Sequence, residues 1–202
     1  MKPIVIASNN QHKIAEIRAI LETVFGENLP EVKSLAEIGY DKEIVEDGTT
    51  FEENAAIKAK TIASLGYIAI ADDSGLCVDA LDGAPGIFSA RYAGEEHDDE
   101  ANNRKLLREL ENVPDENRGA KFVSVICLAY PDGRTVTARG ECPGKILRTY
   151  RGTAGFGYDP LFFYEPAGQS FAELSGPRKN AISHRARSLA AFAEKMRGEK
   201  LQ

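Results

Sequence analysis

The sequence predicts a mixed α/β fold, in which helices pack on a β-sheet. Short apolar runs typical of buried strands alternate along the chain with longer segments whose apolar residues recur at helical spacing. Groups of glycine, proline, asparagine and aspartate separate these segments, and one of them predicts a hairpin. The length of 202 residues suits one domain with a sizeable core, so we expect residues 1–202 to form a single domain.

The first third of the chain predicts strand, helix, short strand, helix and strand in that order. Asn10 is expected to cap the first helix, and Thr50 the second, because their side chains can accept hydrogen bonds from free helix N–H groups. Gly66 suits the C-terminal end of the second helix. The clearest predicted elements are strand 2–8, helix 11–25, helix 50–65 and strand 67–71.

The remaining chain begins with an irregular stretch over residues 72–94 that is rich in glycine, aspartate, alanine and proline. It also carries enough apolar residues to pack, so we expect it to be an ordered loop. A hairpin is expected around Pro131-Asp132-Gly133. The predicted elements are helix 98–110, strands 122–130 and 134–142, strand 161–164 and a final helix from about Lys179 to Met196.

Several classes of protein are excluded by composition. The longest unbroken apolar run, Val125 to Tyr130, has six residues, against about 20 for a membrane-spanning helix. The N-terminus has too short an apolar run for a signal peptide, so we expect a cytoplasmic protein. The three cysteines have no C-x-x-C spacing, which supports neither a disulfide framework nor a structural zinc site. A net charge of −6 argues against a nucleic-acid partner.

A polar segment follows the first predicted strand and opens the first helix. Free backbone N–H groups and the positive end of the helix dipole favour an anion there, and Lys13 adds a charge one turn later. The segment therefore indicates a phosphate site. A plain strand-to-helix connection capped by Asn10 explains it equally well.

The pair Asp72-Asp73 at the predicted end of a strand is a more specific signal. Successive side chains of a strand point to opposite faces, so one carboxylate can line a site while the other anchors the loop. Carboxylates beside a phosphate site suit Mg²⁺, which takes oxygen ligands, and Glu46 and Glu53 are candidates to share the ion. A solvated turn is the alternative, although unneutralised aspartates in an apolar segment would be costly.

Two further motifs could bind a flat ligand. In Gly155-Phe156-Gly157-Tyr158-Asp159-Pro160, glycines allow close approach and a base could stack on either aromatic ring. The same residues could instead plug the space beneath a loop. Ser183-His184-Arg185 lies on the last predicted helix, where His184 and Arg185 could line a pocket or decorate the surface.

Taken together, six ordered motifs resemble one family over nearly the whole chain, the non-canonical purine nucleoside triphosphate pyrophosphatases, also described as inosine/xanthosine triphosphate pyrophosphatases. The motifs are Ser8-Asn9-Asn10-x-x-Lys13-x-x-Glu16, Phe51-Glu52-Glu53-Asn54-Ala55-x-x-Lys58-Ala59, Ala71-Asp72-Asp73-Ser74-Gly75-Leu76, Gly83-Ala84-Pro85-Gly86-Ile87-x-Ser89-Ala90-Arg91-Tyr92, Gly155-Phe156-Gly157-Tyr158-Asp159-Pro160 and Ser183-His184-Arg185. A chance match of all six in order is implausible.

The resemblance implies a Mg²⁺-dependent hydrolase that cleaves ITP, dITP, XTP and dXTP to the nucleoside monophosphate and pyrophosphate, which cleanses the nucleotide pool. It implies a long twisted mixed β-sheet flanked by helices, two lobes with a central cleft, and a homodimer. Asp73 would accept a proton and bind Mg²⁺ with Glu46, Lys58 would add positive charge, and Ser74 would contact substrate. The phosphates would be held by Ser8, Asn9, Asn10, Gln11, His12 and Lys13. The base pocket would be formed by Phe156, Gly157, Tyr158, Asp159, Lys179, His184 and Arg185.

The chemistry of these residues agrees with that reading. Cleavage of a phosphoanhydride needs charge neutralisation and an aligned water more than covalent catalysis. Donors on His184 and Arg185 would suit the 6-oxo group and N7 of a purine, whereas the 6-amino group of adenine would set donor against donor. A pyrophosphatase for pyrimidine or otherwise modified nucleotides on a related fold, and a nucleotide-binding sensor without turnover, remain alternatives.

Overall fold

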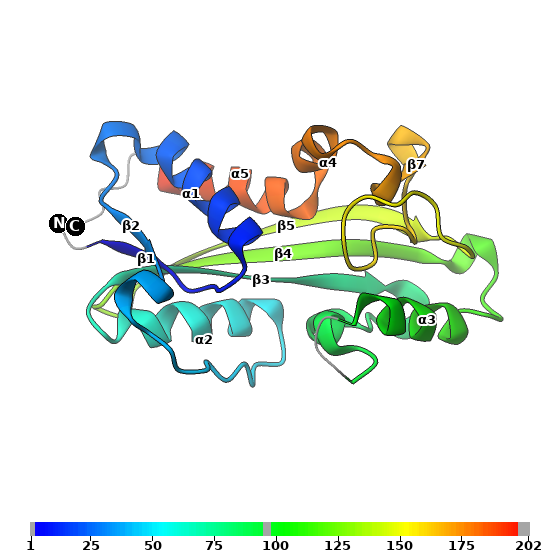
Figure 1. The fold of residues 1–202 in the computed structure, drawn as a ribbon, viewed down its shortest axis with the longest axis horizontal. Coiled ribbons are helices and arrows are strands. Elements are labelled where there is room, and N and C mark those ends of the chain that lie inside the picture. The colour runs from blue at the N-terminus through cyan, green and yellow to red at the C-terminus, as the bar shows by residue number, and fades with distance from the viewer. Residues whose placement is uncertain (1–2, 95–97, 198–202) are drawn as a thin grey trace. The chain divides into compact units, whose positions relative to one another are not determined.

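The computed structural model describes residues 3–94 and 98–197, and its helices and strands alternate as the sequence predicts (Figure 1). The helices are α1 Gln11–Phe25, α2 Phe51–Ala63, α3 Asp99–Glu109, α4 Gly176–Ile182 and α5 His184–Met196. The strands are β1 Ile4–Ile6, β2 Val32–Ser34, β3 Ile68–Val78, β4 Gly119–Ala129, β5 Thr135–Ile146, β6 Phe162–Tyr164 and β7 Gln169–Ser170.

The strands form one mixed sheet in the order β2-β1-β3-β4-β5-β6-β7. Strand β1 runs parallel to both β2 and β3, with Ile4 opposite Val32 and Ile68. Strand β6 is antiparallel to both β5 and β7. The predicted mixed α/β class is therefore confirmed.

The chain divides into two compact units. Unit 1 comprises residues 1–73, 124–140 and 188–202, and unit 2 comprises residues 74–123 and 141–187. Among the helices in residues 3–94 and 98–197, none is long and apolar enough to cross a membrane.

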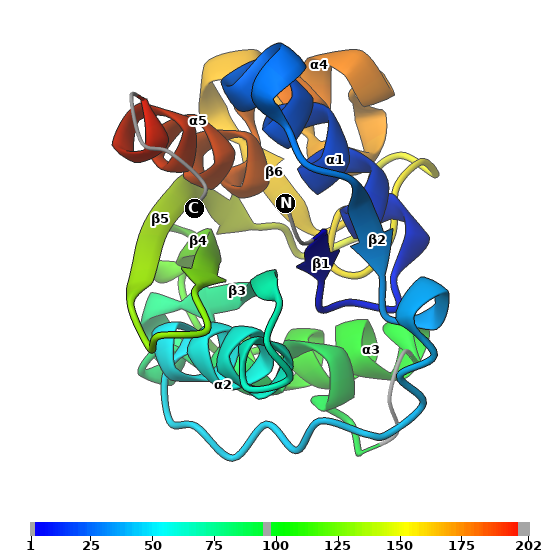
Figure 2. The ribbon, with the colours of Figure 1, turned by 90° about the vertical axis from the view of Figure 1, so that its left-hand side faces the viewer.

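In unit 1, helices α1 and α5 cover one face of the strands and α2 covers the other (Figure 2). The apolar residues of α1 recur at the spacing that places them on one helix face, and they meet residues of α5 and the strands in one core. Its members include Ile4, Ile6, Ile14, Ile17, Leu21, Ile70, Leu128, Phe192 and Met196.

Unit 2 has its own core, which is rich in aromatic rings. Phe122 lies 4.6 Å from Phe162 and 5.7 Å from Phe171, measured between ring centroids. Leu106 of α3 and Leu110, the residue that follows α3, belong to the same core, and Figure 1 shows α3 and α4 on opposite sides of the strands. Aromatic pairs at these distances add to the stabilisation from burial alone.

The predicted caps of α1 and α2 are confirmed in their main feature. Asn10 Oδ1 accepts a hydrogen bond from the Lys13 N–H at 3.2 Å, and Thr50 Oγ1 accepts from the Glu53 N–H at 3.1 Å. The Glu53 carboxylate accepts from the backbone and hydroxyl of Thr49 rather than from Thr50. Gly66 ends this segment at a positive φ of 88°, as predicted.

The prediction of an irregular stretch from residue 72 is wrong at its start. Strand β3 continues through Val78, so Asp72 and Asp73 lie inside the strand and not at its end. Leu76 and Val78 are fully buried, which is the two-residue alternation of a half-covered strand. Beyond it, residues 79–81 and 86–91 form short 3₁₀ helices.

The prediction of one final helix is also wrong. Ser183 has an extended backbone, with φ −64° and ψ 161°, and it separates α4 from α5. Its hydroxyl accepts a hydrogen bond from the Ala186 N–H at 3.2 Å, so Ser183 caps α5 as a serine commonly does. Consequently, His184 and Arg185 lie in the first turn of a helix rather than in the middle of one.

Candidate active site

The two consecutive aspartates of β3 pair with lysines from helices on opposite faces of unit 1. Asp72 Oδ2 lies 3.1 Å from Lys13 Nζ of α1, and Asp73 Oδ1 lies 3.5 Å from Lys58 Nζ of α2. The alternation of side chains along a strand predicts this division. Asp72 therefore forms its ion pair on the α1 face. Asp73 lies on the α2 face and is the carboxylate that we consider for catalysis.

On the α2 face, Lys58 joins two carboxylates. Its ammonium donates a hydrogen bond to Glu46 Oε2 at 2.6 Å and contacts Asp73 at 3.5 Å. The side chains of Lys58 and Asp73 are each 12% exposed, and that of Glu46 is 33% exposed. Glu46, Lys58 and Asp73 are separated by 12 and 15 residues in sequence, and we call them the acid–lysine cluster.

The electrostatics of the cluster follow from its burial. Burial raises the pKa of Asp73 above its ordinary value, and the nearby Glu46 carboxylate raises it further, while the ammonium of Lys58 opposes the rise. Burial lowers the pKa of Lys58, but the charges of Asp73 and Glu46 outweigh it, so the pKa of Lys58 is raised overall. Asp73 is therefore a stronger base than an exposed aspartate, which suits proton abstraction.

The oxygen atoms of this cluster fit a hard divalent cation. Asp73 Oδ2 is buried and has no hydrogen-bond partner among the described residues, and Glu46 is partly exposed. No group of three or more His, Cys, Asp or Glu side chains converges in the described part of the chain. That arrangement suits Mg²⁺, which proteins commonly hold with one or two carboxylates together with waters and substrate phosphates.

The polar segment before α1 has the form of an anion site. Ser8 Oγ accepts a hydrogen bond from the Asn10 N–H at 3.2 Å, and Asn10 caps the helix. Asn9, Asn10 and Gln11 are exposed, while Ser8 and Lys13 are partly buried. The side chain of His12 lies outside the described part of the structure. The positive dipole end of α1 favours an anion at this segment.

In unit 2, the loop over residues 155–160 separates its two aromatic rings into different environments. Phe156 is 59% exposed, whereas Tyr158 is 4% exposed and donates its hydroxyl hydrogen to the Ser89 carbonyl at 2.8 Å. Tyr158 therefore packs in the interior beneath the loop, and Phe156 is the ring that is accessible for stacking.

Asp159 and Lys179 brace this loop from within. Asp159 is 3% exposed, accepts a hydrogen bond from the Phe156 N–H at 3.0 Å and forms an ion pair with Lys179. Lys179 Nζ also lies 4.7 Å from the centroid of the Phe156 ring, within reach of a cation–π interaction. A Cβ at Gly155 would collide with the Asp159 carboxylate, and the φ of Gly155 is 81°, so glycine is required there.

His184 and Arg185 begin α5 and are each 8% exposed. The His184 ring stacks on Phe122 with centroids 4.9 Å apart and an interplanar angle of 17°. This packing fixes the plane of the His184 ring. Ser74, the first residue of unit 2, is partly exposed.

The Ham1 family model matches residues 4–195 of the chain. The chain belongs to the Ham1 family. It is 52% identical to the dITP/XTP pyrophosphatase of Leuconostoc mesenteroides over 196 residues, which cover 96% of each chain. It is also 52% identical to the enzyme of that name from Bacillus licheniformis over 94% of this chain and 95% of that one.

Solved structures of the family have the same fold. The Ham1 protein of Staphylococcus aureus is 44% identical to this chain and superimposes with a TM-score of 0.90, covering 98% of this chain and all of the other. The nucleoside-triphosphatase, or dITP/XTP pyrophosphatase, of Mycobacterium abscessus is also 44% identical and has a TM-score of 0.81, covering 94% and 98% of the two chains.

Three side chains that contact these clusters were not among the predicted site residues. Asn54 of α2 is 2% exposed, lies near enough to Asp73 to lower the pKa of that carboxyl, and accepts a hydrogen bond from the Gly48 N–H at 2.9 Å. Asp99 and Asn103 of α3 hydrogen bond to Gly157. Asn54 lies four residues before Lys58, and that spacing on one helix face was the available signal.

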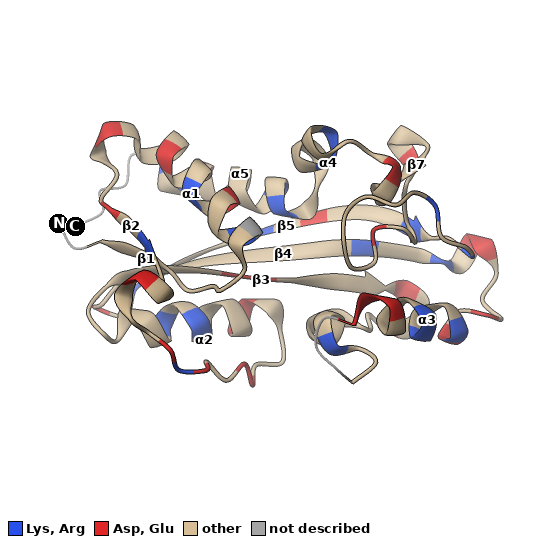
Figure 3. Ribbon diagram, viewed as in Figure 1, with Lys and Arg blue, Asp and Glu red and all other residues tan. Residues whose placement is uncertain are grey.

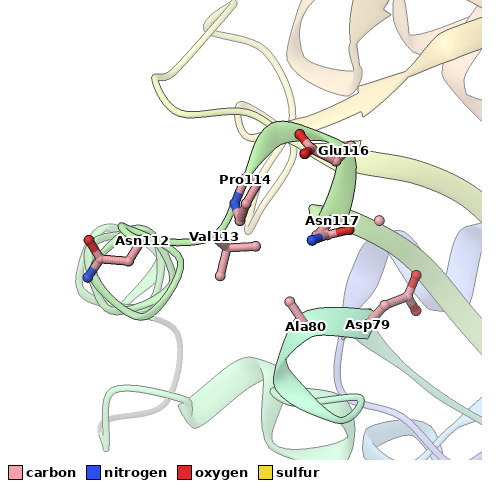
Figure 4. Close-up of a pocket in the computed structure, with 8 residues that line it drawn as sticks. Asp79, Ala80, Asn112, Val113, Pro114, Glu116 and Asn117 are labelled. Carbon is pink, nitrogen blue, oxygen red and sulfur yellow. The ribbon is translucent and has the colours of Figure 1, made fainter.

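The hollow drawn in Figure 4 lies elsewhere in unit 2. Its volume is about 540 Å³. None of the predicted site residues lines it; the lining residues are Asp79, Ala80, Asn112, Val113, Pro114, Glu116, Asn117 and Gly119. The candidate site therefore depends on the clusters above and not on this hollow.

Proposed function

We propose that this chain hydrolyses non-canonical purine nucleoside triphosphates, the ribo- and deoxyribo- forms of ITP and XTP, to the nucleoside monophosphate and pyrophosphate. The observation that carries the proposal is the acid–lysine cluster, in which a buried carboxylate of raised pKa lies beside a lysine and a second carboxylate. Family membership and relatives named dITP/XTP pyrophosphatases support the choice of substrate.

In the proposed reaction, a water oxygen forms a bond to the α-phosphorus while the bond from that phosphorus to the bridging oxygen breaks. Pyrophosphate leaves, and Asp73 accepts the proton of the attacking water. Lys58 and Lys13 offset negative charge on the phosphates, and the N-terminus of α1 with residues 8–13 holds phosphate oxygens. Asp73 suits its role because burial raises its pKa.

A divalent cation is part of the proposal, with Asp73 and Glu46 as its protein ligands. When bound, Mg²⁺ neutralises phosphate charge and polarises the phosphoryl group. The carboxylate oxygens fit such an ion because one of them, Asp73 Oδ2, is buried with no hydrogen-bond partner in the described chain. Lys58 holds the two carboxylates near one another before the ion binds.

The proposal assigns recognition of the base to residues of unit 2. Phe156 offers an exposed ring for stacking, and Lys179 and Asp159 hold the loop that carries it. His184 and Arg185 donate hydrogen bonds to the 6-oxo group and N7, and Ser74 contacts the substrate. The 6-amino group of adenine is itself a hydrogen-bond donor, so it would face the donors of His184 and Arg185. Each buried group left unpaired by this mismatch costs about 1–3 kcal/mol.

The proposal also includes a homodimer, as the family resemblance implies, and a cytoplasmic location, as the N-terminal sequence suggests. The mass in solution by light scattering tests the first, and cell fractionation tests the second.

The decisive experiment is a substrate panel of ITP, dITP, XTP, dXTP, ATP, GTP, TTP and UTP with Mg²⁺, scored for pyrophosphate and orthophosphate separately. We expect pyrophosphate from the ITP and XTP forms, little turnover of the others, and loss of activity in EDTA that Mg²⁺ restores. Preference for TTP or UTP would favour a pyrimidine-directed enzyme. Tight ITP binding with no product would favour a sensor. Undiminished turnover in EDTA would contradict the proposed role of the divalent cation.

A further inference from the structure

Helix α3 holds both backbone polar groups of Gly157, the residue next to the exposed ring of Phe156. Asp99 Oδ2 accepts a hydrogen bond from the Gly157 N–H at 2.6 Å, and Asn103 Nδ2 donates one to the Gly157 carbonyl at 2.8 Å. Asp99 and Asn103 are four residues apart, so they lie on one face of α3. We call this pair the α3 clamp.

The clamp acts on a residue that has little conformational restraint of its own. Gly157 has a φ of 61°, in the left-handed region, and glycine crosses between regions of φ more readily than any other residue. On one side of it Tyr158 is buried and bonded to Ser89, and on the other Phe156 is 59% exposed. Asp159 holds both backbone polar groups of Phe156, and the orientation of the Phe156 ring depends in addition on how firmly the neighbouring Gly157 backbone is held.

The two residues of the clamp differ in burial, and Asp99 is the exposed one. Asn103 is 3% exposed, and its Oδ1 has no hydrogen-bond partner in the described part of the chain. A buried amide with an unsatisfied oxygen is a poor choice for packing alone, since an apolar side chain of similar size would avoid that cost. The bond from its Nδ2 to Gly157 is what this side chain supplies.

The distribution of charge along α3 favours the hydrogen bond that Asp99, the other residue of the clamp, accepts. The acidic residues Asp99 and Glu100 lie in the first turn of α3 and the basic residue Arg108 lies in the last. Figure 3 shows that acidic and basic residues both occur along α3. A carboxylate is stabilised at a helix N-terminus by the helix dipole, and a hydrogen bond to a carboxylate is stronger than one to a neutral acceptor.

We propose that Asp99 and Asn103 are positioning residues, which hold the Gly157 backbone so that Phe156 is preset to stack on the base. This inference rests on the proposed function, in which the loop over residues 155–160 recognises the base. A preset ring lowers the entropy lost on binding. The clamp thus contributes to substrate affinity and base selectivity and not to the hydrolytic step, which the proposal assigns to the acid–lysine cluster of unit 1.

The test compares Asp99→Ala, Asp99→Asn, Asn103→Leu and the control Glu100→Ala. Asp99→Asn keeps an acceptor for the Gly157 N–H and removes only the charge. Asn103→Leu keeps the volume and removes the donor. Glu100→Ala removes the neighbouring first-turn carboxylate, which pairs with the exposed Arg104. For each variant kcat and KM are measured with ITP and ATP, together with inhibition by pyrophosphate and the melting temperature.

We expect Asp99→Ala and Asn103→Leu to raise KM for ITP about tenfold, the equivalent of about one hydrogen bond. Their kcat and pyrophosphate inhibition should stay within about twofold of wild type, and the ITP-to-ATP ratio of kcat/KM should fall. Glu100→Ala should resemble wild type, and Asp99→Asn should lie between wild type and Asp99→Ala, because it keeps an acceptor and loses the charge. Should Asp99→Ala fail to fold, Asn103→Leu alone carries the test.

Two outcomes would overturn the inference. In the first, both clamp variants keep the wild-type KM and ITP-to-ATP ratio. In the second, kcat falls while KM is unchanged, which would mean that the bonds serve general stability or the chemical step. Failure of the proposed function is a separate result, because the wild-type protein itself would then release no pyrophosphate from ITP or XTP.

Discussion

Replacing Lys58 with methionine should destabilise the folded protein strongly. The side chains of Lys58 and Asp73 are each 12% exposed and that of Glu46 is 33% exposed, so removing the ammonium leaves two carboxylates together in a mostly buried place. Breaking a buried ion pair in this way typically costs 3–5 kcal/mol. Because Glu46 is partly solvated, we expect the lower end of that range, about 3 kcal/mol.

The loss can be measured by urea and thermal unfolding at pH 7.5 in EDTA, so that no divalent cation replaces the ammonium. For a chain of this length, about 3 kcal/mol corresponds to a fall in melting temperature of roughly 6–12 °C. A matched control is Lys121→Met. Lys121 pairs with Glu141 at 2.9 Å, but the side chains are 40% and 35% exposed, and such pairs contribute about 1 kcal/mol or less.

A double-mutant cycle with Asp73→Asn isolates the electrostatic cause. The pKa of Asp73 is raised in the folded protein, so its ionised form opposes folding at pH values above that pKa. Asp73→Asn alone should therefore leave the free energy of unfolding unchanged or increase it at pH 7.5. In the double variant, about 2 kcal/mol of the Lys58→Met loss should return.

The same reasoning predicts a pH dependence. The loss caused by Lys58→Met comes from carboxylate charge without its cation. It should therefore shrink as the pH falls and Asp73, whose pKa is raised by burial, becomes protonated. Equal losses for Lys58→Met and Lys121→Met, or strict additivity of Lys58→Met and Asp73→Asn, would refute the account of a buried and coupled cluster.

The other predictions concern catalysis, base binding and thiol reactivity. Asp73→Asn should lower kcat for ITP about 10²- to 10⁴-fold while the melting temperature is maintained, as expected for loss of a general base. Phe156→Ala should lower kcat/KM for ITP about tenfold to a hundredfold through lost stacking, with little change in stability because the ring is exposed. Iodoacetamide at pH 8 should alkylate the partly exposed Cys77 before Cys142, because burial raises the pKa of the Cys142 thiol to about 11.

Each of these predictions has a clear contrary result. Near-normal turnover by Asp73→Asn would exclude its role as proton acceptor. For the stacking ring, Tyr158→Phe is the control, since it removes only the hydroxyl bond to Ser89 and should cost stability rather than base affinity. An equal effect of Phe156→Ala on ITP and on pyrophosphate inhibition would argue against stacking. Equal labelling of the two thiols in the native protein would contradict the burial argument.

Local signals in the sequence were sufficient for most helices and strands. The caps at Asn10 and Thr50 were predictable because each hydrogen bond joins residues three apart. The continuation of β3 to Val78 was not predicted, since the glycine and aspartates of that segment usually indicate a turn. The two-residue spacing of the apolar residues Leu76 and Val78 indicated a strand. The glycine and aspartates around them made that pattern hard to recognise.

Some features of the candidate site were likewise predictable from the sequence, and others were not. The residue types and their spacing were enough to establish the reactive groups, the family resemblance and the order of the motifs. Three features became visible only in the folded chain: Lys58 lies between Glu46 and Asp73, Tyr158 is buried while Phe156 is exposed, and α3 holds Gly157 from 54 and 58 residues away. Burial and hydrogen bonds of this kind join segments distant along the chain, and their energies arise only when folding removes those segments from water.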